Sequence, residues 1–316
     1  MKKSIILLIS TILVLLTSCN KGIEPEIDSN ATCEISLNFV GEISTTITPL
    51  TKSINSADLL GIQVYKINNG SESKFAYGLF DDASNIKLHM QKGFKYRIVA
   101  TVLKNGKSLL YKSSSGYYYP FNRGSSNTNI TNSFIYSTSS YFDYLGSGMI
   151  ENTGYDYVKY PEALRYYAEV LNYSPVENGS LPIELKHTGF GIKYKVKGLT
   201  DGTLALNVKN SSRSFIDESA ISSDGESDTK YFSFYNVSDA WKYADDYMED
   251  ITVSVKWARG IGVTSDLGSK TVKVKRNQIN SINVTLSSDD GGGSLNFNVE
   301  PDSSMGGETL NVNLGN

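Results

Sequence analysis

The sequence predicts an all-β protein of two tandem antiparallel sandwich domains that follow an export signal. Three observations carry this prediction. The chain opens with a short apolar segment that ends at a cysteine, most of the remaining chain alternates apolar and polar residues, and a loop-rich stretch separates two strand-rich regions. An alternation of period two places neighbouring side chains on opposite faces of a strand, as a half-buried sheet requires.

Residues 1–18 are predicted to be a lipoprotein signal peptide. Lys2 and Lys3 precede an apolar run that ends in Leu16-Thr17-Ser18-Cys19. Small residues before the cysteine let a signal peptidase reach the bond, and Cys19 then becomes the lipidated first residue. The alternative is a transmembrane anchor, but the run is shorter than the ~20 residues that span a bilayer. Several acyl chains on Cys19, palmitate among them, would hold the protein at a membrane.

Residues 19–32 are expected to form an extended tether, because they are polar and contain Pro25. Asn20 is not the aspartate that is associated with retention at the inner membrane. The tether is acidic through three residues, Glu24, Glu26 and Asp28. These features favour the outer membrane, and display at the cell surface is a further hypothesis.

Length and composition limit the remaining possibilities. A chain of 316 residues is long enough for about two domains that each bury a core. The net charge of −3 gives no reason to expect a nucleic-acid partner. Cys33 is the one cysteine left beside Cys19, and we expect it to be a small buried strand residue, with intermolecular pairing as the alternative.

Residues 33–175 are predicted to form the first sandwich. Alternating apolar residues mark strands near 35–39, 62–64, 86–90 and 94–102. The breaks carry turn residues, at Asn69-Gly70, at Lys92-Gly93 and at Asn105-Gly106, so we expect sequential antiparallel hairpins. Residues 113–160 are rich in Ser, Asn, Gly and Tyr and are expected to be loops. Residues 161–170 are the one plausible helix of this half.

Residues 176–290 are predicted to form the second sandwich, with the boundary between the domains near residues 173–178. Its strands are marked by alternation at 183–187, 190–196, 204–208, 251–257, 272–274 and 282–286. Residues 217–228 are polar and are expected to be a surface loop. Residues 291–316 contain a glycine-rich hinge and two further alternating runs, Leu295 to Val299 and Leu310 to Leu314.

Signals for catalysis are nearly absent, so we expect no catalytic residue, no cofactor and no metal site. The two histidines, His89 and His187, each lie in an apolar alternation and are expected to be satisfied strand residues. Asp224, Glu226 and Asp228 alternate as in a calcium loop but lack its closing acidic residue. Three acidic pairs could in principle serve a glycosidase, but we expect solvated turn residues instead: Asp81-Asp82, Asp245-Asp246 and Glu249-Asp250.

The 21 tyrosines are the one compositional anomaly, and many fall in the loop-rich stretch. Tyr117, Tyr118 and Tyr119 are the candidate ligand-binding residues, because a tyrosine on a surface loop can stack against a sugar ring or anchor a protein contact. The alternative is that these side chains fill the edges of the core. A glycan-binding outer-membrane lipoprotein is therefore the second functional hypothesis.

Several segments resemble the fimbrillin-like cell-surface lipoproteins of Bacteroidales, the group related to type V pili. Beside the lipobox, the segments that carry the resemblance are Ala76 to Asp82, Arg165-Tyr166-Tyr167, Leu185 to Tyr194, and Val274-Lys275-Arg276-Asn277 leading into Ile282 to Leu286. The resemblance implies two transthyretin-like or immunoglobulin-like sandwich domains and a structural or adhesive role in cell adhesion, as a fimbrial subunit or anchor. Its implied partners are other fimbrial subunits, or host or glycan ligands.

The resemblance also implies, for stalk subunits, strand exchange after an arginine-specific protease removes the first strand. Here the first arginine is Arg97, so no such cut is available between Cys19 and the first domain. A retained lipid favours an anchor over a released stalk subunit. The runs at 295–299 and 310–314 have the alternation of donated strands, but we expect them to complete their own domain or to pack on the first one.

Overall fold

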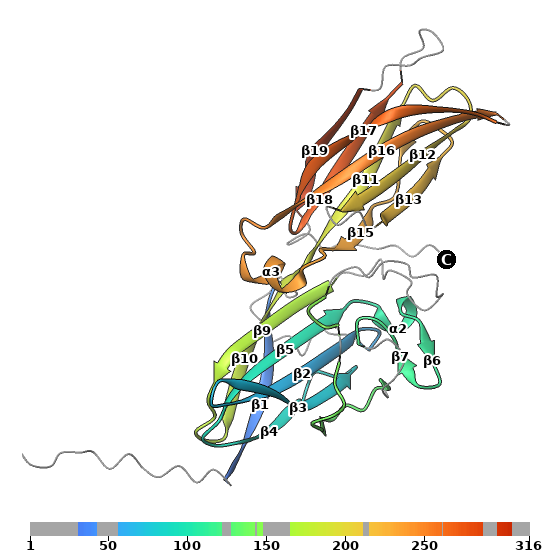
Figure 1. Cartoon of the computed structure of the whole chain (residues 1–316). Helices are drawn as coiled ribbons and strands as arrows, with labels where there is room; N and C mark the ends of the chain where they lie inside the picture. The colour runs from blue at the N-terminus through green and yellow to red at the C-terminus, as the bar shows by residue number, and fades with distance from the viewer. Residues whose placement is uncertain are drawn as a thin grey trace, which may run out of the picture.

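The strands assemble into two β-sandwiches stacked end to end (Figure 1). The computed structural model describes residues 31–42, 56–121, 128–142, 144–147, 165–210, 215–260, 262–286 and 296–304. Cys19, the tether before residue 31, the predicted glycine hinge and the run at 310–314 lie outside these segments. Within the segments, no helix is long and apolar enough to cross a membrane.

The N-terminal sandwich consists of two sheets that join where β9 and β10 pair. One sheet has the strand order β4-β1-β10 and the other has the order β9-β5-β2-β3-β8. The strands are β1 (Thr32–Gly41), β2 (Leu59–Asn68), β3 (Ser71–Phe80), β4 (Lys87–Gln91), β5 (Lys95–Leu103), β8 (Ile135–Tyr136), β9 (Arg165–Tyr173) and β10 (Gly179–His187).

Alternate side chains of each strand point into the space between these sheets, as the sequence pattern predicts. On β1, Cys33, Ile35, Leu37 and Phe39 are all buried, whereas the residues between them are not. They pack against the inward faces of β2, β4, β5, β9 and β10 in one continuous core. Burial of these side chains is the main stabilising contribution to the sandwich.

A second apolar layer covers the outer face of the larger sheet. It joins outward residues of β2, β3 and β5 to the loop-rich stretch, with Leu110, Tyr117, Phe121, Phe142 and Leu145 all buried in it. The segment that covers this face begins before residue 113. It includes the short helix α2 (Gly106–Leu109) and the two-residue strands β6 (Lys112–Ser113) and β7 (Gly116–Tyr117). The loops therefore act as a lid that makes both faces of the sheet apolar.

The predicted hairpin topology is wrong for the first domain. β2 and β3 do form a hairpin at Asn69-Gly70, but β1 pairs with β10 in parallel, Ile35 opposite Gly179. The Asn105-Gly106 pair does not close a hairpin, because Asn105 has a positive φ of 55° and the chain continues into α2. Local turn chemistry sets the bend, whereas burial of the strand faces sets which strands pair.

The helix predicted at residues 161–170 is also wrong where the structure describes it. Residues 165–170 belong to β9, which pairs with β5 in antiparallel register. Tyr166 and Ala168 face the sandwich core and Tyr167 faces the outer layer, which is a strand periodicity. Pairing and two-sided burial outweigh the weak helical pattern of this short segment.

The C-terminal sandwich packs a sheet of order β14-β11-β18-β19, with β15 also on β11, against a sheet of order β13-β12-β16-β17. Its elements are β11 (Gly189–Lys197), β12 (Thr203–Asn210), β13 (Phe215–Ile221), β14 (Gly225–Glu226), β15 (Lys230–Ser233), α3 (Val237–Lys242), β16 (Met248–Gly260), β17 (Val263–Lys275), β18 (Gln278–Thr285) and β19 (Asn296–Ser304). The surface loop predicted at residues 217–228 is wrong for its first part. The residues up to Ile221 belong to β13.

The change from one core to the other falls later than the predicted boundary near 173–178. That stretch links β9 to β10, and both strands belong to the N-terminal sheets. Leu181, Ile183 and Leu185 accordingly lie in the N-terminal core, and the C-terminal core begins at Phe190. The sequence shows no composition shift at residue 188, because β10 and β11 follow one another almost without a loop.

Residues 296–299 of the run at 295–299 form part of β19, which is the edge strand of the chain's own C-terminal sheet. Phe297 lies opposite Val284 and Val299 opposite Ile282 in antiparallel register with β18. This is the first of the two alternatives that the sequence left open. The run at 310–314 lies outside the described residues.

The β2–β3 turn gives a testable prediction. Gly70 has φ 80°, and a Cβ there would meet nothing within 4 Å, so Gly70→Ala is strained by its backbone alone. We expect the free energy of unfolding to fall by about 1 kcal/mol in urea titrations. Gly179→Ala is the control, because its surroundings are equally open and its φ is not left-handed. Equal losses in the two variants would contradict the assignment.

Candidate functional site at the domain junction

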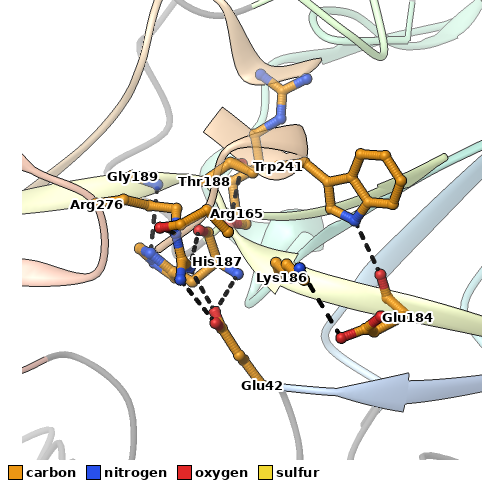
Figure 2. Close-up of polar contacts among 10 residues, drawn as sticks. Glu42, Arg165, Glu184, Lys186, His187, Thr188, Gly189, Trp241 and Arg276 are labelled. Atoms are coloured by element: carbon orange, nitrogen blue, oxygen red, sulfur yellow. Dashed lines mark hydrogen bonds and ion pairs between the residues drawn. The ribbon is translucent and has the colours of Figure 1, made fainter. Parts of the chain in front are cut away.

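Four buried polar residues, Arg165, His187, Thr188 and Arg276, lie where the two sandwiches meet. β10 ends at His187 and β11 begins at Gly189, so Thr188 alone connects the strands. Figure 2 shows Glu42 and Arg276 meeting at His187, Arg165 beside Thr188 with its side chain directed away from the connection, and Trp241 of α3 reaching Glu184. We call Glu42, Arg165, His187 and Arg276 the junction cluster.

An ion pair between Glu42 and Arg276 ties the two sandwiches together. Arg276 Nη1 donates to Glu42 Oε2 at 2.6 Å and Nη2 donates to Oε1 at 2.8 Å, which is a bidentate geometry. Glu42 follows β1, the central strand of the N-terminal sheet, and Arg276 follows β17 of the C-terminal sandwich. Arg276 is 7% exposed and the Glu42 side chain is 30% exposed, so water reaches the pair from the carboxylate side and screens it in part.

The remaining hydrogen bonds of the pair hold the connecting strand itself. Arg276 Nη1 also donates to the His187 carbonyl at 2.8 Å, and its Nε donates to the Ala244 carbonyl at 2.7 Å. Glu42 Oε2 accepts the backbone N–H of His187 at 2.8 Å. Glu42 and Arg276 therefore bind the backbone N–H and the carbonyl of His187, the last residue before the connection between the two sandwiches.

His187 is the buried titratable group of the cluster. Its ring makes an edge contact with Tyr166 at 5.1 Å between centroids, and Nδ1 accepts the N–H of Gly189 at 3.3 Å. Nε2 has no hydrogen-bond partner among the described residues. Burial, reinforced by the charge of Arg276 and opposed by that of Glu42, lowers the pKa of His187 to about 4. The imidazole is therefore neutral at neutral pH.

Arg165 extends the cluster into the lid. This side chain is 2% exposed and donates to the carbonyls of Leu145 and Ser147, both at 2.6 Å, and to the Tyr119 hydroxyl at 3.3 Å. Its own carbonyl accepts the N–H of Thr188 at 2.9 Å. Arg165 therefore positions the loop at 144–147 and the connecting residue together.

Helix α3 of the C-terminal sandwich closes the other side of the junction. Asn236 caps it by accepting the N–H of Asp239 at 3.1 Å. Trp241 Nε1 donates to the Glu184 carbonyl on β10 at 3.1 Å, and Val237 is buried in the lid layer of the N-terminal sandwich. The helix therefore belongs in sequence to one sandwich and packs against the other.

The structure places the three candidate ligand-binding tyrosines in the lid. Tyr117 and Tyr119 are 4% and 5% exposed, and the Tyr119 hydroxyl donates to the Ser147 carbonyl at 2.7 Å. Tyr118 is partly exposed and makes an edge contact with Tyr111. The burial of Tyr117 and Tyr119 favours the alternative that the sequence left open, in which these rings fill the apolar layer over the sheet, and ligand binding by this segment stays a prediction.

The acidic residues weighed for catalysis or calcium are engaged locally. Asp81 pairs with Lys107 and accepts from Asn132, and Asp250 pairs with Lys273 at 2.9 Å. Asp224 accepts the N–H groups of Gly198 and Leu199. No group of three or more His, Cys, Asp or Glu residues in the described part of the chain is arranged to hold a metal ion.

Cys33 is a buried strand residue, as expected, with 1% of its surface exposed. We predict that a water-soluble thiol reagent does not modify Cys33 in the native protein and modifies it in denaturant, with Cys19→Ser as the background so that Cys33 is the one thiol of the chain. The absorbance of the chromophore that the reagent releases measures the extent of thiol modification. Rapid modification under native conditions would contradict the packing described for β1.

Sequence reasoning missed the pairing of Glu42 with Arg276. The segments with Arg165, His187 and Arg276 all carried the family resemblance, but nothing in their spacing shows that they meet. Glu42 lies 234 residues from Arg276 and carries no local signal. Of the two histidines, His89 is exposed on β4, whereas His187 is buried with Nε2 unpaired among the described residues.

Comparison with protein-family models found no match, and comparison with curated proteins found no significant match. Solved structures do match. A candidate adhesin from Bacteroides ovatus shares 10% identity, with 87% of this chain and 95% of that chain covered and a TM-score of 0.44. The fimbrial anchor protein Mfa2 from Porphyromonas gingivalis shares 8% identity, with 87% and 100% covered and a TM-score of 0.42.

A fimbrial assembly protein from Parabacteroides distasonis shares 14% identity, with 86% and 99% of the two chains covered and a TM-score of 0.33. The matches are thus to adhesin-type and fimbrial proteins of Bacteroidales, the group that the sequence resembles. At these identities and TM-scores they show similarity to this chain and do not establish that it belongs to a family.

Proposed function

We propose that this chain is a non-enzymatic, lipid-anchored surface protein that serves as a structural or adhesive subunit or anchor of the fimbrillin-like type. The observation that carries the proposal is the lipobox that ends at Cys19. The described body that follows is built of β-sandwiches whose buried polar groups serve to hold the parts of the chain together.

The position of β1 supports an anchor over a released subunit. β1 lies between β4 and β10 and carries Cys33 to Phe39 into the core, so it is an integral strand of the sandwich. Glu42, directly after β1, binds Arg276 of the other sandwich. The first arginine of the chain is Arg97 on β5, so an arginine-specific protease has no site between Cys19 and β1. The lipid would therefore stay covalently joined to the strand that holds both sandwiches.

Metabolic labelling with an alkyne fatty acid tests the anchor. The full chain should incorporate the label and float with outer membranes on a density gradient, and Cys19→Ser should do neither. Cys33→Ser is the matched control and should be labelled as the parent is. Incorporation that persists in Cys19→Ser, or parent protein that is released without label, would overturn the proposal.

Exposure at the surface is tested separately by adding protease to intact cells. Loss of the body while a periplasmic marker stays intact is the result expected for an outer-leaflet protein. Protection of the body in intact cells, with digestion after lysis, would place the protein on the inner leaflet. That result would exclude an adhesive role.

A further inference from the structure

Three turns lie beside the start of β1 at one end of the N-terminal sandwich. The backbone N–H of Lys92 donates to the Ala31 carbonyl at 2.9 Å, and that of Glu34 donates to Asn178 Oδ1 at 2.9 Å. Ile67 at the end of β2 lies opposite Lys95, so the β2–β3 turn is at the same end. We call this surface, formed by Ala31 with residues 68–71, 91–95 and 171–179, the entry end; in Figure 1 it is the end of the N-terminal sandwich where the blue strand β1 begins.

The entry end carries the two most exposed large aliphatic side chains of the described residues. Val176 is 70% exposed and Leu171 is 58% exposed, whereas the other exposed large hydrophobic residues range from 37% to 54%. Both belong to the β9–β10 hairpin. Tyr166 pairs with His187 and Tyr167 with Lys186, and the midpoint of these pairs along the chain falls between Val176 and Glu177. Val176 therefore lies at the middle of the loop between β9 and β10, which we call the apex.

Three lysines lie near this apex, whereas the tether that precedes Ala31 is acidic through Glu24, Glu26 and Asp28. Lys92 and Lys95 form no ion pair among the described residues, and Lys66 lies 4.2 Å over the ring of Phe94 with its ammonium hydrogen-bonded to Gln91. Glu177 is the exposed carboxylate beside them. Two further carboxylates among the described residues near this end are paired, Glu34 with Lys87 at 2.7 Å and Glu72 with Arg97 at 2.8 Å. An apolar apex beside three lysine ammonium groups is complementary to a bilayer with anionic headgroups.

The chain length limits what the entry end can reach. Ala31 lies 12 residues after Cys19. Twelve residues span at most about 40 Å and average roughly 20 Å as a random chain. If Cys19 is lipidated, the entry end is therefore held within this distance of its own bilayer at a high effective concentration, so even a weak contact with lipid is populated.

We propose that the entry end is a lipid-docking surface, with Val176 and Leu171 entering the headgroup region and Lys66, Lys92 and Lys95 contacting anionic headgroups. The inference rests on the proposed lipid anchor. It adds that the body stands on the membrane by one defined end, which directs the C-terminal sandwich away from the bilayer. Free diffusion of the body around its tether would leave that direction undefined.

The test uses the full lipidated protein in vesicles of phosphatidylcholine with one-quarter phosphatidylglycerol. Ser174→Cys, beside the apex, is labelled with an environment-sensitive fluorophore, since Cys33 is buried and Cys19 carries the lipid. Thr264→Cys on β17 of the C-terminal sandwich is the matched control. Lipid brominated near the headgroup should quench the label at position 174 and leave the one at 264 unchanged.

Variants then identify the groups responsible. Replacing both Val176 and Leu171 by Asp should lower the ratio of docked to undocked protein at least tenfold and abolish the quenching. Lys92→Glu with Lys95→Glu should weaken docking on the order of fivefold per lysine on anionic vesicles, and much less on pure phosphatidylcholine. Leu109→Asp and Val263→Asp, exposed away from the entry end, should leave the quenching unchanged.

Vesicle flotation separates the two proposals. Protein that floats with its label at position 174 unquenched overturns the docking inference and leaves the anchor standing. Protein that fails to float overturns the anchor and the inference with it. Quenching that is equal at positions 174 and 264 also overturns the inference, because it would show that the body lies on the bilayer without a defined orientation.

Discussion

Replacing Arg276 by methionine is expected to cost about 2–3 kcal/mol of unfolding free energy, less than for a fully buried pair, because the Glu42 carboxylate that loses its partner is 30% exposed. Methionine keeps much of the apolar volume, so the loss reports the charge and its hydrogen bonds. The His187 and Ala244 carbonyls lose a donor at the same time. The urea midpoint measures the loss. Calorimetry should resolve the unfolding into two transitions, one for each sandwich.

Lys273→Met is the matched control for this variant. Lys273 lies near the end of the same strand and pairs with Asp250 at 2.9 Å, but its side chain is 68% exposed. Exposed pairs contribute at most about 1 kcal/mol, so this variant should unfold almost as the parent does. Equal losses for the two variants would show that the junction pair contributes no more than a surface pair.

A double variant sharpens the interpretation. Glu42→Leu alone should also destabilise the protein, because the guanidinium of Arg276 then has no carboxylate. The two changes together should cost clearly less than the sum of the single losses, because neither charge is left unpaired. Additive losses would mean that Glu42 and Arg276 act independently, in contradiction to their bidentate contact.

The protein should lose stability as the pH falls from 6.5 toward 4, and His187 should carry a separable part of the loss. In the unfolded chain this histidine has a pKa near 6.5, whereas burial lowers its pKa in the folded protein to about 4. The unfolded state therefore takes up a proton in this interval that the folded state does not. Linkage gives a loss of about 2 kcal/mol by pH 5 and roughly 3 kcal/mol near pH 4.

His187→Asn isolates this contribution. The asparagine Oδ1 can accept the Gly189 N–H as Nδ1 does, and it does not titrate between pH 7.5 and 4. The variant should have a lower stability at pH 7.5, through lost contact with Tyr166, but a flatter dependence on pH. His89→Asn is the control, because the side chain of His89 is 57% exposed. If both variants keep the parent's pH dependence, His187 is not the group that resists protonation.

Individual strands were predictable because burial on one face leaves a direct mark in the sequence. Ile35, Leu37 and Phe39 on β1, or Ile251, Val253 and Val255 on β16, alternate with polar residues and are buried as expected. Tyr166 and Tyr167 show where this fails. Both faces of β9 are covered, so all of its first four residues are buried and the period-two pattern is lost.

The junction could not be predicted for a different reason. Glu42, Arg165, His187 and Arg276 come from four segments whose contacts depend on the parallel pairing of β1 with β10 and on the turn after β17. The pairing of β1 with β10 leaves no local pattern in the sequence, because the hydrogen bonds between strands are made by backbone groups and not by particular side chains. The same limit applies to Tyr117 and Tyr119, whose burial depends on the lid that folds over them.

The sequence by itself determined the β class of the body and the positions of most strands, because each depends on residues that are neighbours along the chain; the export signal that ends at Cys19 stays a prediction of the sequence. Only the tertiary structure decided that β10 belongs to the first sandwich, that Arg276 reaches Glu42, and that Val176 is at the end where β1 begins. These depend on which distant strands bury each other's faces. That choice is made by the free energy of the whole fold.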